Sequence, residues 1–211
     1  MRIAIIGSGN VGGTLGTRWA RNGHTVTFSS RNSGSLEMKR LVEEAGPTAR
    51  AGSVAEAAAG CELLLLATPW PAAREALASA GDLSGKILID ATNPLLPRLA
   101  GLEFGNNTSG AEQVAGWARG AKVVKAFNTV GFNIMANPRF NGRAAILFFC
   151  GDDPAAKHAV RDLAAELGFE PEDAGPLARA RLLEPFALLW ITLSMTPGHS
   201  REFAFQLMKR A

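Results

Sequence analysis

The sequence has 211 residues, of which 47% are hydrophobic and 19% are charged, and its formal net charge is +3. These values are typical of an ordinary soluble globular protein with one substantial core, and the length hardly leaves room for two full domains. The chain has no cluster of lysine and arginine, no apolar run of the roughly 18 residues that span a bilayer and no signal peptide, so we expect a cytoplasmic protein that binds neither nucleic acid nor membranes.

A glycine-rich motif follows the first predicted strand. Residues 1–6 form a short apolar run typical of a buried strand, and the motif opens directly onto a helical pattern. In this context Gly-x-Gly-x-x-Gly predicts a dinucleotide site: the first glycine allows a tight turn, the second a close approach to the pyrophosphate and the third close packing of helix on strand. The predicted pyrophosphate-binding residues are Gly7, Ser8, Gly9, Asn10, Val11 and Gly12.

The end of the second predicted strand, residues 25–28, indicates which dinucleotide is bound. NAD enzymes usually carry an acid here to bind the ribose 2′-hydroxyl, but this chain has Ser30, Arg31 and Asn32 and no acid. A carboxylate would repel a 2′-phosphate, whereas Arg31 can bind it with paired hydrogen bonds. We therefore predict NADP(H) in preference to NAD(H); the alternative is that Arg31 is a solvated loop cation.

Strands and helices alternate through the next 120 residues, which predicts a Rossmann-type, doubly wound and mainly parallel α/β sheet. Helices are predicted at residues 36–45, 54–59 and 72–80, and strands at residues 48–51, 61–67, 86–90, 123–127 and 144–150. Ligands of such sheets bind beyond the carboxyl ends of the strands. The candidate cofactor contacts in the loops at that edge are Thr68, Pro69, Trp70, Asn93 and Asn128.

The last third of the chain differs in pattern. We predict an NADP-binding domain over residues 1–152 and a small, mostly helical part over residues 153–211, with helices at 153–167 and 178–195 and a final strand beginning at 168–170. The helix at 178–195 contains Pro185, so a kink or break is expected near Glu184. Its apolar residues lie nearly all round, which predicts a homodimer interface assisted by a last helix carrying residues 203–208, or alternatively burial within one subunit.

The residue types present restrict the chemistry. The chain has no tyrosine, His24, His158 and His199 are poorly placed for catalysis, and neither a metal-ligand spacing nor a Ser/His/Asp arrangement is visible. Cys61 and Cys150 lie in apolar segments and are expected to be buried free thiols. A nucleotide site without an obvious acid or base suits hydride transfer to an acceptor that needs no protein proton donor, such as a flavin-like ring or an oxidised metal complex.

Two polar residues remain as candidates for assisting that transfer. Asn128, at the exit of its strand, is the better candidate for touching the nicotinamide or its ribose, and it is the one candidate catalytic residue. Lys125 alternates with apolar neighbours, so an ordinary strand lysine explains it at least as well.

Several motifs together, in the same order along nearly the whole chain, resemble the deazaflavin-dependent (coenzyme F420-dependent) NADP oxidoreductases. They are the glycine motif, Ser30-Arg31-Asn32, Thr68-Pro69-Trp70, Lys125-Ala126-Phe127-Asn128-Thr129, Cys150-Gly151-Asp152-Asp153, Asp173-Ala174-Gly175-Pro176-Leu177 and Arg181-Leu182-Leu183-Glu184. The resemblance implies that Ser30 and Arg31 bind the 2′-phosphate, that Pro69 and Trp70 lie near the cofactor, and that a C-terminal helical part closes the active site and dimerises.

The resemblance further implies direct hydride transfer between nicotinamide C4 and deazaflavin C5. The family's deazaflavin reductases carry a slightly longer glycine loop and a histidine at the position of Asn128. The runs at residues 90–94 and 126–131 look more like a wider bacterial group and the cytosolic NADPH domain of membrane ferric reductases. The small-molecule acceptor that we expect is coenzyme F420 or a flavin-like compound. Alternatives are that the acceptor is a ferric complex, an imine or a carbonyl compound, or that the protein is a non-catalytic NADP-binding or sensing module.

Overall fold

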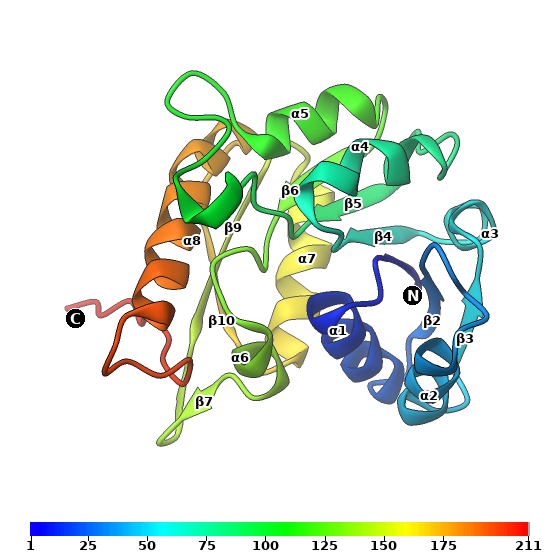
Figure 1. Ribbon diagram of the computed structural model, residues 1–211, viewed down its shortest axis with the longest axis horizontal. Coiled ribbons are helices and arrows are strands. Elements are labelled where there is room, and N and C mark those ends of the chain that lie inside the picture. Colours follow the sequence, from blue (N-terminus) through cyan, green and yellow to red (C-terminus); the bar gives the residue numbers. More distant parts are fainter. Residues whose placement is uncertain (211) are drawn as a thin grey trace.

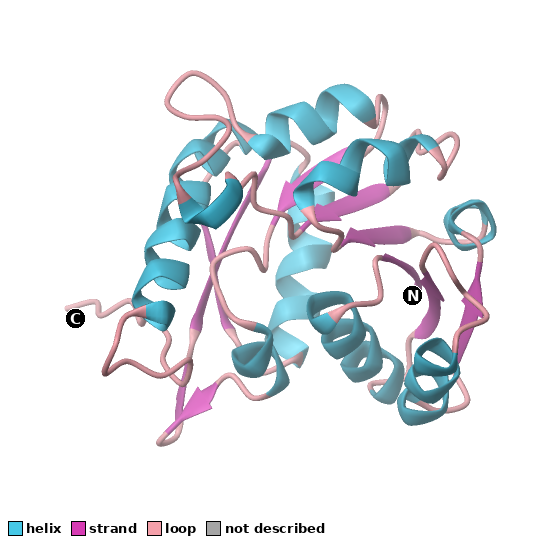
Figure 2. Ribbon diagram, in the orientation of Figure 1, coloured by secondary structure: helices cyan, strands magenta, loops and turns pink. Residues whose placement is uncertain are grey.

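Eight short strands form one sheet with helices on both faces (Figures 1 and 2). The computed structural model describes residues 1–210. In spatial order the strands are β10 (Glu170–Asp173), β9 (Ile146–Gly151), β6 (Lys122–Lys125), β5 (Ile87–Asp90), β4 (Leu63–Leu66), β1 (Arg2–Ile6), β2 (Thr25–Ser29) and β3 (Ala49–Gly52). Strands β1 to β6 are parallel, and β9 and β10 run antiparallel to them, which confirms the Rossmann-type, mainly parallel sheet.

The helices are divided between the two faces of the sheet. Buried residues of α1, α2, α6 and α7 belong to one hydrophobic core, and those of α3, α4 and α5 belong to the other. Their bounds are α1 (Asn10–Arg21), α2 (Leu36–Ala45), α3 (Val54–Ala59), α4 (Trp70–Ala78), α5 (Gly110–Trp117), α6 (Phe132–Ala136), α7 (Pro154–Glu166) and α8 (Ala180–Met195), with short 3₁₀ helices at Pro97–Leu99 and Leu177–Arg179.

Strand β4 shows why the central strands are continuously apolar. Leu63 and Leu65 enter the first core, whereas Leu64 and Leu66 enter the second, because successive side chains of a strand point to opposite faces. All four side chains are fully buried. A strand covered by helices on both faces must be apolar at every position, as the run at residues 61–67 predicted.

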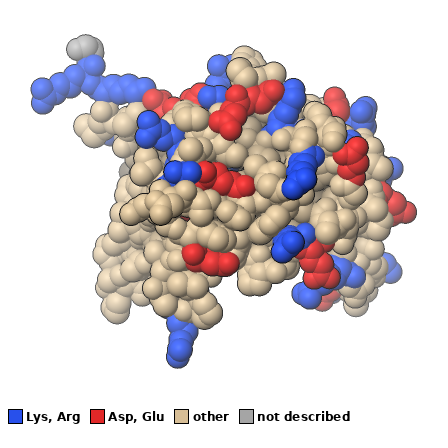
Figure 3. Space-filling view, turned by 90° about the horizontal axis from the view of Figure 1, so that it is seen from above, with Lys and Arg blue, Asp and Glu red and all other residues tan. Residues whose placement is uncertain are grey.

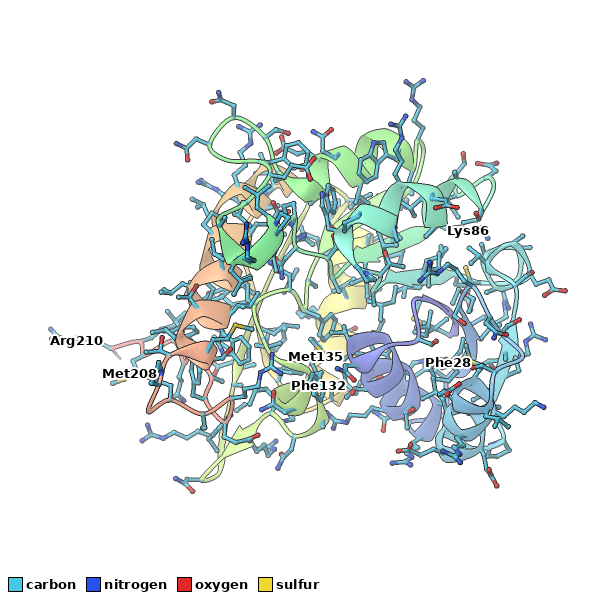
Figure 4. All side chains as sticks on the ribbon, in the orientation of Figure 1. Phe28, Lys86, Phe132, Met135, Met208 and Arg210 are labelled. Carbon is cyan, nitrogen blue, oxygen red and sulfur yellow. The ribbon has the colours of Figure 1, made fainter. Side chains whose placement is uncertain are left out.

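Helix α1 lies against the Phe28 ring of β2 at Gly16, where the helix has no side chain. A Cβ atom on Gly16 would lie 2.4 Å from the ring of Phe28 on β2. The Phe28 ring is fully buried and lies beside α1 in Figure 4. Close packing of this helix sets the position of its N-terminus, where the glycine motif lies.

The predicted elements through α4 are confirmed within two residues at each end, and α7, β10 and α8 also lie where they were predicted. Sequence patterns missed α5, α6 and the two-stranded hairpin of β7 (Arg139–Phe140) and β8 (Arg143–Ala144). Of the kink or break expected near Glu184, the break does not occur, since α8 continues through Pro185. Pro185 is the sixth residue of the helix and removes a single backbone donor there.

The predicted last helix at residues 203–208 is also wrong. After Pro197 and Gly198 the chain forms neither helix nor strand up to the last described residue, 210, and the Phe205 carbonyl accepts a hydrogen bond from the Ile146 amide at the start of β9. Phe203 stacks on Trp190 at 5.2 Å between ring centroids. This segment is therefore held by strand-like and aromatic contacts, and its end, with Met208 and Arg210, projects from the body (Figure 4).

Both cysteines are buried, and charges of both signs are mixed on the surface. Cys61 and Cys150 are buried free thiols, as predicted, and burial raises the pKa of Cys150 to about 12. On the face that carries α4 and α5, basic and acidic side chains are interspersed (Figure 3). Within residues 1–210 no helix combines the length and apolar character needed to cross a bilayer.

Candidate functional site

The loops that follow β1, β2, β4, β5 and β6 lie along one edge of the sheet, because these strands are parallel. From β1 the chain winds outward through β2 and β3 and then returns to β4 on the other side of β1 (Figure 1). The connections leaving β1 and β4 therefore diverge to opposite faces and open a crevice at this edge, which is where open α/β sheets bind their ligands.

The three glycines of the first loop lie in different steric environments. Gly7 adopts a φ of +95°, and a Cβ there would lie 2.8 Å from the Ala67 carbonyl. A Cβ on Gly12 would lie 1.9 Å from the Gly7 carbonyl oxygen. Gly9 has an ordinary φ of −71°, and a Cβ there would meet no atom of the described residues within 4 Å. The space in front of Gly9 is therefore open.

The N-terminus of α1 begins directly after Gly9. Its N-cap is Gly9, with no side-chain cap and no acidic residue in the first turn. The first backbone N–H groups of the helix therefore have no side-chain partner, and the positive end of the helix dipole is uncompensated. These features fit a pyrophosphate, the group that the sequence motif predicted here.

A cavity of about 610 Å³ extends from the glycine loop to the exit of β2. Arg31 lines it together with Ser30, and no acid comes from the β2 exit; its one acidic lining residue, Glu75, comes from α4. The lining residues are Ile6, Gly7, Ser8, Gly9, Ser29, Ser30, Arg31, Ser33, Ser53, Val54, Ala55, Thr68, Pro69, Ala72, Glu75, Ala76 and Ser79. The cavity thus brings together seven of the residues predicted from the sequence.

The part of the cavity wall that α3 and α4 form was not predicted from the sequence. Ser53 accepts a hydrogen bond from the Glu56 amide, and the Glu56 carboxylate accepts one from the Ser53 amide, so the pair forms a capping box that starts α3 at this edge. The Ser-x-x-Glu spacing was the available signal. On α4 the wall is made mainly by small residues, for which the sequence offered no signal.

Several predicted contacts lie outside this cavity. Asn10 lines a second hollow, of about 750 Å³, between α1 and α2, which shares Ser8 and Gly9 with the first. Val11 packs against the core, and the Asn32 amide donates to the Ser30 hydroxyl in the turn after β2. Trp70 is buried.

Trp70 belongs to an aromatic cluster that joins α4 and α5 to the loop at residues 94–109. Its Nε1 donates to the Glu103 carboxylate at 2.6 Å, and its ring stacks on Trp117 at 5.2 Å between centroids. Phe104 meets the same ring edge-on. Trp70 therefore anchors the connection that follows β5, and its ring is committed to these contacts.

Asn93 and Asn128 form a pair at the exits of β5 and β6. Asn128 Nδ2 donates to Asn93 Oδ1 and to the Leu183 carbonyl of α8, each at 3.1 Å, and Asn93 Nδ2 donates to the Asn128 carbonyl at 2.9 Å. Asn128 Oδ1 is buried and has no hydrogen-bond partner among the described residues; the same holds for Thr68 Oγ1 at the exit of β4. An orphaned acceptor at this edge fits a ligand that donates a hydrogen bond.

A strained backbone conformation at Phe127 immediately precedes Asn128. Phe127 adopts a φ of +64°, a left-handed conformation that costs a non-glycine residue about 1 to 3 kcal/mol. Its buried ring packs edge-on against Trp19 of α1 and against Phe169. These contacts anchor the ring on the core and force the chain to turn sharply just before Asn128.

Lys125 is buried in an ion cluster and is not a free proton donor. Its Nζ lies 2.9 Å from Asp90 Oδ2, 3.0 Å from Glu184 Oε1 and 2.6 Å from the Thr92 carbonyl oxygen. Burial acts to lower the pKa of Lys125, but the two carboxylates outweigh burial and hold this pKa above its usual value. The side chain is therefore an ammonium ion with all three donors engaged.

The second carboxylate of the cluster ties α8 to α5. The Glu184 carboxylate accepts hydrogen bonds from the Gly110 and Ala111 amides at 2.9 and 3.0 Å, at the N-terminus of α5. The helix dipole thus helps to balance the extra negative charge of the cluster. Nearby, Arg181 donates twice to Glu112, and this hydrogen bonding lowers the pKa of Glu112.

Comparison with known proteins identifies the family. Residues 2–94 match the family described as NADP oxidoreductase, coenzyme F420-dependent. A crystal structure of a proposed F420-dependent NADP reductase from Arthrobacter sp. FB24 is 33% identical, has a TM-score of 0.89, and is matched over 99% of this chain and 100% of that one. The chain belongs to this family. The resemblance inferred from the sequence is thus confirmed, and this protein is an NADP-dependent oxidoreductase.

Two further comparisons give one more sequence relative and one shared fold. It is 32% identical to metalloreductase STEAP3 of Rattus norvegicus over 188 residues, which are 89% of this chain and 36% of that protein. The chain spans about a third of the length of the curated relatives it matches. A reductive aminase from Aspergillus terreus shares the fold, with 22% identity and a TM-score of 0.67 over 90% of this chain and 59% of that one.

Proposed function

We propose that this oxidoreductase transfers hydride between NADP(H) and a deazaflavin, coenzyme F420, or a flavin-like acceptor. The observation that carries the proposal is the chemistry of the residues at the exits of β4, β5 and β6. Lys125 is fully buried with every donor engaged, and His24 lies at the start of β2, at the opposite edge, where it contacts Glu166 and the N-terminal amine. A ring that accepts hydride without a proton from the protein matches a site of this kind.

The protein's part in the reaction is to bind and orient. The uncapped N-terminus of α1 and the backbone at Gly9 would hold the pyrophosphate, and Arg31 with Ser30 would hold the 2′-phosphate. Asn93 and Asn128 would contact the nicotinamide half, and the nicotinamide supplies the hydride when bound. The aromatic cluster around Trp70 ties the loop after β5 to α4 and α5, and a loop held in this way would limit access of water to the nicotinamide.

We expect NADPH to be oxidised when the enzyme is mixed with coenzyme F420 or FMN, followed at the nicotinamide absorbance. Parallel reactions with a ferric chelate and with a cyclic imine test the other acceptors. A ferric chelate is included because of the likeness to STEAP3, and an imine requires a proton that this site does not provide. Turnover with the imine but with neither ring system would contradict the proposal, and NADH in place of NADPH provides the cofactor control.

We also propose that the enzyme is a homodimer joined through α8. One face of α8 is buried in its own subunit through Leu183, Ala187 and Trp190, but Leu182 and Leu189, two turns apart, are 60% and 49% exposed. Apolar side chains repeated at this spacing on one helix face favour contact with a second copy.

Replacing Leu182 and Leu189 together with glutamate is expected to convert a dimer into a monomer, measured by light scattering at micromolar concentration. Leu36, on α2, is 68% exposed and lies outside this face, so Leu36→Glu should leave the mass unchanged. A monomeric wild-type protein under the same conditions would remove the dimer proposal.

A further inference from the structure

The orientation of the Asn128 side chain is set by main-chain groups. Its amide nitrogen faces the Leu183 carbonyl, which can only accept, and the Asn93 amide nitrogen likewise faces the Asn128 carbonyl. Asn93 must therefore present its oxygen to Asn128, as it does at 3.1 Å. Both N–H groups of Asn128 are thus committed, and its Oδ1 is left as a buried acceptor without a partner among the described residues.

The buried ion cluster, Asp90, Lys125 and Glu184, holds the same three segments of backbone as this amide pair. Lys125 binds the Thr92 carbonyl, adjacent to Asn93, and Glu184 is adjacent to Leu183. Lys125 itself lies three residues before Asn128 on the same strand exit. All three ionic side chains are no more than 1% exposed, so their contacts are not weakened by solvent. The cluster therefore fixes β5, β6 and α8 relative to one another where the amide pair is built.

We propose that Lys125 and Glu184 are positioning residues that hold Asn128 so that its Oδ1 accepts a hydrogen bond from the nicotinamide half of NADP(H). This inference rests on the proposed placement of the nicotinamide at the exits of β5 and β6. A buried acceptor without a partner is unfavourable, and a donor on the ligand would remove that penalty. The donor is an N–H of the carboxamide or a hydroxyl of the adjoining ribose; both present the same chemistry to the oxygen.

The test compares two ligands by calorimetric titration. NADPH has the nicotinamide half, whereas adenosine 2′,5′-bisphosphate has only the phosphorylated adenosine half. In Lys125→Met and in Glu184→Gln we expect NADPH to bind about tenfold more weakly, and the bisphosphate to bind within about twofold of the wild type. Lys122→Met is the matched control, because Lys122 lies on the same strand in a half-exposed ion pair with Asp153 and should leave both affinities unchanged.

A double variant tests whether the cluster acts through Asn128. If it does, Asn128→Ala should weaken NADPH binding to a similar extent, and adding Lys125→Met to it should cause little further loss. The reduced 3-acetylpyridine analogue of NADPH, which lacks the carboxamide N–H, distinguishes the two donors. A wild-type preference for NADPH over the analogue that disappears in Asn128→Ala assigns the carboxamide, and equal losses for both cofactors assign the ribose hydroxyl.

Three results separate failure of this inference from failure of the proposed function. Equal weakening of both ligands in the cluster variants would mean that the cluster only supports the fold, and unchanged NADPH affinity would mean that it does not position Asn128; either overturns the inference. A wild-type protein that binds the bisphosphate but gains no affinity from the nicotinamide half would instead overturn the proposed placement. If Lys125→Met does not fold, Glu184→Gln carries the comparison, since glutamine keeps the size and one acceptor oxygen of the side chain.

Discussion

Replacing Arg31 with alanine is expected to weaken NADPH binding by about 1.5 to 3 kcal/mol and to leave NADH binding almost unchanged. Arg31 lines the cavity at the exit of β2, and none of the hydrogen bonds found within residues 1–210 involves its side chain, so its guanidinium is available to a ligand. The 2′-phosphate is the group that distinguishes the two cofactors. A charge-assisted contact to that phosphate therefore contributes to the binding of only one of them.

Titration of both cofactors into wild type and Arg31→Ala measures the difference. Arg74→Ala is the matched control for loss of a positive charge near the site, because Arg74 is exposed on α4 and does not line the cavity. Its effect should be small and should shrink further as salt is added. Equal losses of NADPH and NADH in Arg31→Ala would show that the arginine stacks on the adenine or contacts the shared part of the cofactor, and the 2′-phosphate assignment would be wrong.

The features that could be predicted from the sequence are those set by neighbours along the chain. The glycine motif, the absence of an acid at the exit of β2 and the apolar run of β4 each report a local constraint: a tight turn, a charge preference and burial on two faces. Such constraints act within a few residues. They were sufficient for the fold class, most element bounds and much of the lining of the cavity at the exits of β1 and β2.

The features that were missed depend on contacts between distant segments. Lys125 lies 35 residues after Asp90 and 59 residues before Glu184, so the alternating pattern of β6 could not reveal that its lysine is buried between two carboxylates. The direction of the Asn128 amide likewise depends on a carbonyl of α8. The predicted last helix failed for a related reason: Phe203 and Phe205 are held by Trp190 and by the start of β9, and tertiary contacts override local helix preference.

The proposed adenosine and nicotinamide ends of the site are built in different ways. The adenosine end uses backbone amides, hydroxyls and one arginine around an open cavity, which suit a polyanion and need little support. The nicotinamide end uses neutral amides fixed by a strained turn at Phe127 and by buried charges behind them. Affinity for the cofactor can therefore come mainly from the first end, while the second sets the orientation on which hydride transfer depends.

Substituting alanine for Gly9 and for Gly12 is expected to separate cofactor binding from folding. Gly12→Ala places a methyl 1.9 Å from the Gly7 carbonyl oxygen and 2.9 Å from Ile5 Cγ2, so the loop or the helix must move, at a cost of about 2 to 3 kcal/mol in the free energy of unfolding. Gly9→Ala meets no atom of the described residues within 4 Å and keeps an ordinary φ, so the free energy of unfolding should change by less than about 0.5 kcal/mol.

The two variants should behave differently toward NADPH. A methyl at Gly9 occupies the space through which the backbone must approach the pyrophosphate, so the Kd for NADPH should rise at least about tenfold in a protein whose melting temperature is unchanged. Gly12→Ala should lose both stability and binding. Chemical denaturation and calorimetric titration of each variant give the two quantities independently. If Gly9→Ala bound NADPH as tightly as the wild type, the pyrophosphate could not lie against this loop, because the space in front of Gly9 would then serve no ligand.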